Sequence, residues 1–168
     1  MLTMGGGGGA DATRSVLAGK ILRDTVSTID KKTSSAIVLM MSANYGGQLV
    51  GESGNLAYDS SGNVAWQTTQ SVGSSTSVVW GASFGVGRTI STADDIRNFE
   101  GAATGIGLTL CLPEGFSVDI MWFESTTDPG KMEYALTIAY VWGAELEGHL
   151  LEAYTETKHL LNLWSIFD

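Results

Sequence analysis

The sequence predicts a mainly β fold: an antiparallel barrel or closed sandwich of about eight strands, preceded by an N-terminal amphipathic helix. Glycine is abundant, with 22 residues, and proline is nearly absent, with two among 168. From residue 36 onward, apolar residues recur with a period of two, which is the period of a strand. Clusters of turn-forming residues separate these runs. The length is typical of one domain with its own core.

Two segments precede the predicted strands. Residues 1–10 contain a run of five glycines, which predicts a flexible tether. Residues 11–30 show apolar residues at spacings of three and four, which predicts an amphipathic helix. This helix either packs on the core of the domain or contacts a membrane. In the second case the contact residues are Leu17, Ile21, Leu22, Val26 and Ile29.

The β body is predicted to extend over residues 36–157. Its first half gives strands at 37–43, 47–58, 63–72 and 75–91. The residues at 59–63 tolerate turn geometry, so the second and third strands form a hairpin. The glycines of the fourth strand indicate bends or the close approach of a neighbour.

The second half of the β body follows an irregular link at 91–101, which predicts a short helix or an ordered loop. Strands are then expected at 105–112 and 116–124. The run 131–157 is too long for one flat strand, so a bend is expected near Gly143. The final segment, 158–168, is apolar, and the helical spacing of Leu160, Trp164 and Phe167 predicts a short helix.

The connections between these strands are mostly short. Short connections favour pairing between consecutive strands, so an antiparallel meander that closes on itself is expected. Closure also removes the exposed edges of an apolar sheet.

Three residues with metal-binding side chains occupy alternate positions near the C-terminus: Glu145, Glu147 and His149. On a strand they share one face, with about 7 Å between neighbours. Two carboxylates and an imidazole are typical of a non-haem iron or manganese site. However, the outer two lie roughly 13 Å apart, so at most two could reach one ion unless Gly148 introduces a bulge. The other interpretation is a solvated strand face near the mouth of the barrel.

Composition excludes some classes of function. The net charge is −9, and no basic stripe is present, so nucleic acid is not an expected partner. No nucleotide-binding or catalytic motif is found, so neither a cofactor nor catalytic residues are predicted. The N-terminal residues have neither a basic nor an apolar region of a secretory signal peptide. One cysteine, Cys111, excludes an internal disulfide.

Part of the β body resembles the glycine-rich β modules at the C-termini of secreted bacterial polymorphic-toxin and RHS-type proteins. The resemblance lies in ANYGGQLVGESGNLAYDSSGNVAWQ and in TISTADDIRNFEGAATGIGL. These segments share a YGG start, a YDxxGN turn and an acidic link before a second glycine-rich strand. The resemblance implies a secreted or extracellular protein, and a cytoplasmic one is left open.

The order of the predicted elements is also similar to that of actinoporin-like pore formers. In both, an amphipathic helix and a basic pair, here Lys31 and Lys32, precede a β body. In those proteins the helix inserts into the bilayer. We therefore expect a non-catalytic, toxin-like and membrane-active barrel, pore-forming or effector, whose partner is a lipid membrane or a protein. The alternative is a soluble barrel that binds a small apolar ligand or a partner protein. Whether it forms a homo-oligomer is left open.

Overall fold

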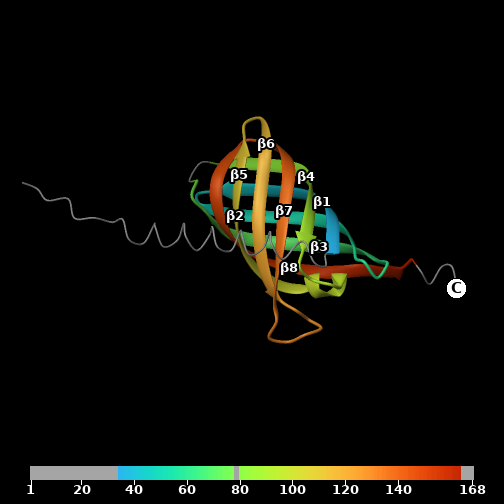
Figure 1. Cartoon of the computed structure of the whole chain (residues 1–168). Helices are drawn as coiled ribbons and strands as arrows, with labels where there is room; N and C mark the ends of the chain where they lie inside the picture. The colour runs from blue at the N-terminus through green and yellow to red at the C-terminus, as the bar shows by residue number, and fades with distance from the viewer. Residues whose placement is uncertain (1–33, 78–79, 164–168) are drawn as a thin grey trace, which may run out of the picture.

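The computed structural model describes residues 34–77 and 80–163, and these form a closed barrel of eight antiparallel strands (Figure 1). The strands are β1 (Ser34–Tyr45), β2 (Gln48–Tyr58), β3 (Asn63–Ser75), β4 (Gly81–Ser91), β5 (Gly101–Cys111), β6 (Glu114–Glu124), β7 (Met132–Gly143) and β8 (Glu145–Asn162). The predicted mainly β class and closed barrel are confirmed. The tether and the helix at 11–30, with its five membrane-contact residues, lie outside the described residues.

The strand order around the barrel is β1-β2-β3-β8-β5-β6-β7-β4. The expected meander is therefore wrong, because β4 pairs with β1 and β7, and β3 pairs with β8. Each half of the chain forms a Greek key, with the orders β4-β1-β2-β3 and β8-β5-β6-β7. The expected single strand at 75–91 is also wrong. The chain leaves the sheet after Ser75 and enters again at Gly81, which allows β4 to cross to the far side of β1.

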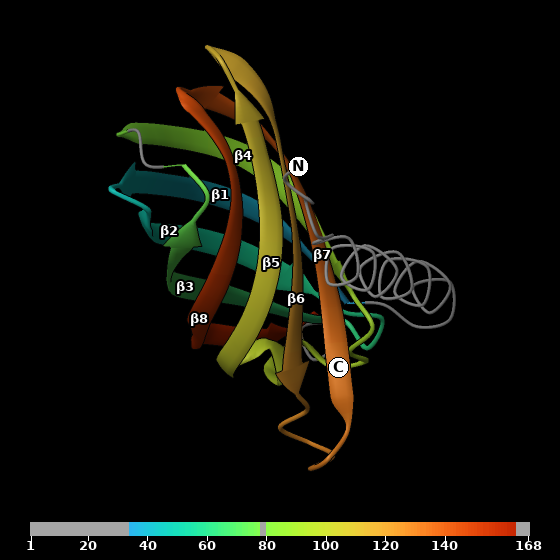
Figure 2. The same ribbon diagram turned by 90° about the vertical axis from the view of Figure 1, so that its left-hand side faces the viewer.

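The two ends of the barrel differ. At one end, which we call the short-turn end, lie the β1–β2, β3–β4, β5–β6 and β7–β8 connections. At the opposite end, the loop end, lie the turn at 59–62, the segment 92–100 and the turn at 125–131. Figure 2 shows β6 and β7 side by side along the length of the barrel, joined at the loop end.

The chain from β7 to the end of β8 confirms one expectation and corrects another. The bend near Gly143 is present, and Gly143 has a φ of 145°, a conformation that few side chains allow. However, residues 158–162 continue β8 and are not helical. They remain extended because they complete the ladder with β3, where Val64 pairs with Leu161. Residues 164–168 lie outside the described part.

The interior at the loop end is filled by the 3₁₀ helix η1 (Ile96–Phe99). Ile96 is fully buried and packs with Ala36, Ala57 and Ala65. Gln67 of β3 donates a hydrogen bond from Nε2 to the Ile96 carbonyl (3.0 Å). The expected short helix in this link is therefore confirmed, and it occludes the barrel at this end.

Candidate binding site inside the barrel

Glu145, Glu147 and His149 lie on the inward face of β8, near the short-turn end. They share one face, as the sequence predicts. The expectation of a solvated face is wrong, because their exposed fractions are 3%, 3% and 8%. The reason is that this barrel points its small and polar side chains inward and its large apolar side chains outward. No register shift occurs at Gly148 in the β5–β8 ladder, so the row stays extended.

Glu147 is held by donors from the neighbouring strand β3 and from β1, which lies across the interior. Its Oε2 accepts hydrogen bonds from Asn44 Nδ2 of β1 (2.7 Å) and from Ser75 Oγ of β3. Asn44 is itself 1% exposed and is further tied to Ser75 Oγ (3.0 Å). Glu147 therefore has a fixed orientation across the interior of the barrel.

Glu145 lies two residues closer to the short-turn end, and its carboxylate also accepts two hydrogen bonds from other strands. Its Oε2 accepts from Ser42 Oγ (2.8 Å) and Ser83 Oγ (2.6 Å), and the two serine hydroxyls are 2.8 Å apart. Its Oε1 has no hydrogen-bond partner. The carboxylate is thus buried among neutral hydroxyl groups, without a positive charge beside it.

His149 lies between two carboxylates. Its Nε2 is 2.7 Å from Asp119 Oδ1 of β6, and its Nδ1 is 3.4 Å from Glu147 Oε1. Because both ring nitrogens face carboxylates, neither is directed at a hydroxyl that it could activate as a nucleophile. The geometry favours an ion-pair and hydrogen-bond role over general-base catalysis.

A glycine makes room for this contact. A Cβ at Gly107 of β5 would lie 1.9 Å from Asp119 Oδ1 and 2.1 Å from His149 Nε2. Any side chain at position 107 would therefore displace the Asp119–His149 pair. This is one position where the abundance of glycine has a clear structural reason.

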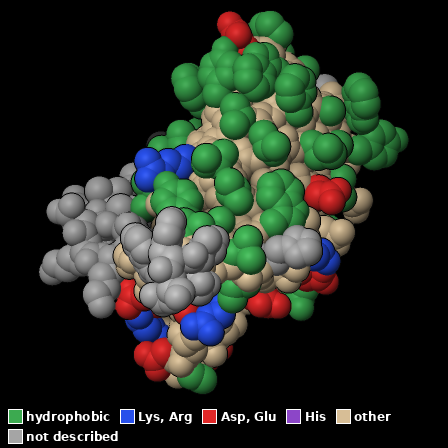
Figure 3. Space-filling view, turned by 90° about the vertical axis from the view of Figure 1, so that its right-hand side faces the viewer, with side chains coloured by type: hydrophobic (Ala, Val, Ile, Leu, Met, Phe, Trp, Pro, Cys, Tyr) green, Lys and Arg blue, Asp and Glu red, His purple; other side chains and the backbone are tan. Residues whose placement is uncertain are grey.

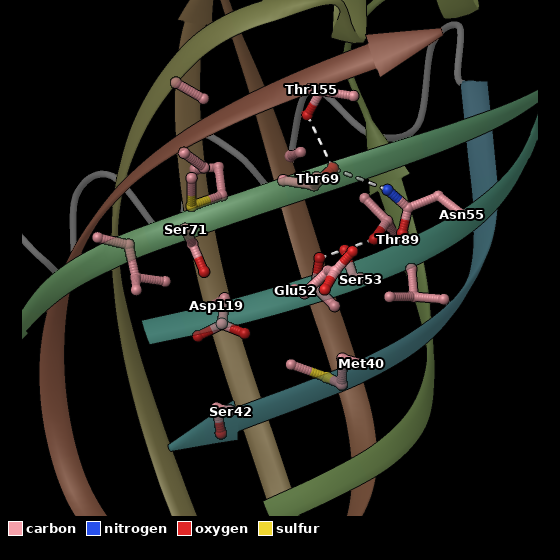
Figure 4. Close-up of a pocket in the computed structure, with 18 of the residues that line it drawn as sticks. Met40, Ser42, Glu52, Ser53, Asn55, Thr69, Ser71, Thr89, Asp119 and Thr155 are labelled. Carbon is pink, nitrogen blue, oxygen red and sulfur yellow. Dashed lines mark hydrogen bonds between the residues drawn. The ribbon is translucent and has the colours of Figure 1, made fainter. Parts of the chain in front are cut away.

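A cavity of about 150 Å³ lies beside this cluster, toward the middle of the barrel (Figure 4). Glu147, His149 and Asp119 form part of its wall. Figure 4 shows Asn55, Thr69 and Thr155 linked by hydrogen bonds along another part. The rest of the cavity wall is partly apolar, and its larger apolar side chains are those of Val38, Met40, Leu49, Met121 and Leu151.

The predicted metal site is not assembled. Within residues 34–77 and 80–163, no group of three or more His, Cys, Asp or Glu side chains is placed to hold a metal ion. The extended row on β8 spreads its three members along the strand, as the spacing argument indicates. Cys111 is 1% exposed and packs with Ala139 and Val141, so it fills the interior as a small hydrophobic residue.

The outer surface carries an apolar band. The aliphatic and methionine members that are at least two-fifths exposed include Ile37, Leu39, Met41, Val86, Leu108, Ile138 and Leu150. Figure 3 shows hydrophobic side chains spread over one face, with most acidic and basic side chains toward its lower end. A polar strip interrupts the band on β2, β3 and β8, where Glu52, Gln70 and Glu152 are exposed.

Aromatic side chains flank this band. Near the short-turn end, Phe84, Trp142, Tyr140 and Phe116 contact one another in sequence across β4, β7 and β6, with ring centroids 5.4, 4.7 and 5.7 Å apart. Toward the loop end lie Tyr58, Trp66, Trp122 and Tyr134. Trp122 and Tyr134 are direct cross-strand neighbours.

Sequence reasoning missed Asn44, Ser75 and Asp119, which complete the interior cluster. The sequence did contain a signal for them: on each strand, small and polar residues alternate with large apolar ones and so lie on the opposite face. In β6, Ser117 and Asp119 alternate with Phe116, Val118 and Ile120. The same small-polar face recurs on the other strands, and together these faces form the interior.

Comparison of the chain with protein-family models, curated proteins and solved structures finds no match. In the described part of the chain, no helix is both long and apolar enough to cross a membrane.

Proposed function

We propose that the protein is a non-catalytic, membrane-active barrel that inserts its outer apolar band into a lipid bilayer. The observation that carries this proposal is the reversed distribution of side chains. Large apolar residues face outward on most strands, while carboxylates, hydroxyls and an imidazole are buried inside. A barrel in lipid requires this arrangement, whereas a barrel in water is usually apolar inside.

The dimensions support the same proposal. A strand of 11 residues, tilted as in an eight-stranded barrel, rises about 28 Å along the barrel axis. This is close to the apolar band of about 25 Å in membrane barrels. Aromatic residues on both sides of the aliphatic band correspond to the two interfaces of a bilayer.

The polar strip of Glu52, Gln70 and Glu152 limits how the barrel is placed. Carboxylates that face acyl chains are unfavourable, so the strip is expected to face water or a neighbouring barrel. The bilayer contact is therefore assigned to the surface over β1, β4, β7 and β6. Because η1 occludes the loop end, one barrel by itself is not expected to conduct, and leakage would require an assembly or the N-terminal segment.

The test is vesicle co-flotation and dye leakage with the full chain. Binding of the wild-type protein to neutral lipid vesicles is expected to be lost in a Leu39→Glu/Ile138→Glu double variant. Thr68→Glu, two residues before Gln70 of the polar strip and on the same outward side of β3, serves as the matched control and is expected to float like the wild type. Absence of flotation with vesicles of every composition tested would overturn the proposal. Deletion of residues 1–30 then shows whether leakage depends on the N-terminal segment.

A second candidate is a ligand-binding barrel, and the interior cavity is the observation that favours it. A barrel of this size can hold one small ligand. Native mass spectrometry of the purified protein would reveal a retained molecule. Toxin-like activity and secretion, which the sequence resemblance implies, remain proposals for the same protein.

A further inference from the structure

We propose that the interior of the barrel binds a small protonated amine. Its ammonium group would lie against the Glu147 carboxylate, and its short alkyl chain would occupy the cavity. The inference does not rest on the lipid proposal, because it uses only inward-facing residues. It also differs from the apolar ligand expected from the sequence, because the ligand is a cation.

The first argument is the set of buried acceptors that lack donors. Glu147 Oε1, in the cavity wall, has no hydrogen-bond partner, and Glu147 is 3% exposed. Asn44 Oδ1 and Glu145 Oε1 also have none, but these two residues lie outside the cavity wall. Asn55 Oδ1, in the cavity wall, also has none. Glu147 Oε1 has only the ion-pair contact with His149 Nδ1 at 3.4 Å. Buried acceptors without donors are costly, so the site favours a ligand that brings N–H groups.

The second argument is charge. The cluster contains three carboxylates, those of Asp119, Glu145 and Glu147, and one imidazole. Acidic side chains therefore outnumber the one basic side chain of the cluster by three to one. All four Lys and Arg residues in the described part, Arg88, Arg97, Lys131 and Lys158, are exposed. A buried charge is normally paired, and among the described residues no Lys or Arg reaches the cluster, so a cationic ligand is complementary.

The third argument separates an amine from a metal ion. The carboxylates are spread along β8 and β6, and no group of three acidic, histidine or cysteine side chains within the described residues converges on one point. An ammonium group needs only one or two well-placed acceptors, and it tolerates longer contacts than an inner-sphere ion. The wall beyond Glu147 is apolar at Met40, Leu49 and Leu151, which suits an alkyl chain but not a hydrated ion.

Size defines the ligand class. A cavity of about 150 Å³ is comparable with one that holds a benzene molecule. A primary amine with about four carbons fits this space, and we choose n-butylammonium as the probe. 1-Butanol has nearly the same shape and no charge, so it is the matched neutral ligand.

The experiment is isothermal titration of the full chain with n-butylammonium chloride at pH 7, in non-ionic micelles, with a titration of empty micelles subtracted. One saturable site is expected for the wild type. Glu147→Gln, which keeps the shape but removes the charge, is expected to weaken binding at least tenfold. Glu152→Gln lies on the same strand but faces outward, and it is expected to bind like the wild type.

Measurements on the wild type alone keep the test decisive if Glu147→Gln does not fold. 1-Butanol, potassium chloride and calcium chloride are titrated under the same conditions, and none is expected to saturate a site or to displace the amine. Absence of a saturable amine signal overturns the inference. Equal binding of butanol, or tighter binding of calcium than of the amine, overturns it as well. Lipid flotation is measured separately, so failure of either proposal is recognised by itself.

Discussion

At the scale of single residues, Gly107 has a role that no other residue can take. Its missing side chain leaves the space in which Asp119 meets His149. We expect Gly107→Ala to separate this pair and to lower the free energy of unfolding by about 1–3 kcal/mol, the usual cost of overpacking. Chemical denaturation followed by circular dichroism measures the change.

Gly148→Ala is the control for this variant. It lies beside His149 on β8, but its added Cβ would meet no atom closer than 3.8 Å. A change of less than about 0.5 kcal/mol is expected there, as for ordinary surface substitutions. Equal losses in both variants would show that a methyl group added anywhere on this part of the sheet is costly, and that the loss does not come from the Asp119–His149 contact.

Individual residues also explain what the sequence could and could not predict about the site. The alternation of Glu145, Glu147 and His149 correctly placed them on one face. A period of two separates two faces of a strand, but it does not say which face is inside. A small barrel has room mainly for small side chains, and the Gly, Ser, Thr and Ala opposite the large residues were the signal for the interior. The partners from β1, β3 and β6 depend on strand order, which alternation does not encode.

At the scale of elements, η1 acts as a plug for the loop end. Ile96 is fully buried against alanines, so truncation leaves a void that the small neighbours cannot fill. Ile96→Ala is expected to cost about 2–5 kcal/mol. Thermal unfolding of the variant measures the loss. Phe99 and Phe123 also pack nearby, with ring centroids 5.6 Å apart, and a loss well under 1 kcal/mol would mean that they close the void.

The cap of η1 gives a pH dependence. Asp95 accepts a hydrogen bond from the Arg97 backbone amide (2.8 Å) and pairs with its guanidinium. The hydrogen bonds from the Arg97 side chain hold the pKa of Asp95 below its ordinary value of 3.8. A carboxylate whose pKa is lower in the folded state contributes stability above its unfolded pKa, and this contribution is lost as the pH falls through the folded value.

We therefore expect the stability difference between wild type and Asp95→Asn to be constant near neutral pH and to shrink below about pH 4. The variant keeps a capping side chain but cannot be charged. Denaturation of both proteins from pH 7 to pH 3 measures the difference. A difference that grows on acidification would contradict the assignment.

At the scale of the whole molecule, the sequence predicted the number of strands and closure, but not the topology. Strand existence follows from local patterns and turns, as in the hairpin around 59–62. Strand order depends on the course of each connection, because the connection decides beside which strand the next one pairs. The segment between Ser75 and Gly81 resembles a continuation of the strand, yet it moves β4 across β1. This crossover makes the first half of the chain a Greek key, and the β7–β8 connection does the same for the second half by placing β8 beside β5.

The charge asymmetry of the barrel predicts its orientation in a bilayer. Outside the barrel at the short-turn end, the described residues include one acidic side chain, Glu114. The loop end carries many more charged side chains outside the barrel: Asp94, Asp95, Arg97, Glu100, Glu124, Asp128 and Lys131. Moving charged groups into the hydrocarbon is costly, so the short-turn end should enter the bilayer and the loop end should stay in water.

An environment-sensitive fluorophore on single cysteines tests this orientation. In a Cys111→Ala background, a label at Leu112→Cys should shift to the blue when vesicles are added, whereas a label at Asp128→Cys should not. Tyr45→Cys, at the same end as Leu112, should behave like Leu112→Cys, because both positions are at least 69% exposed in the barrel alone. A shift at Asp128 without one at Leu112 would reverse the orientation. A shift at neither position, with flotation intact, would mean that both ends of the barrel lie in water and would contradict the predicted entry of the short-turn end.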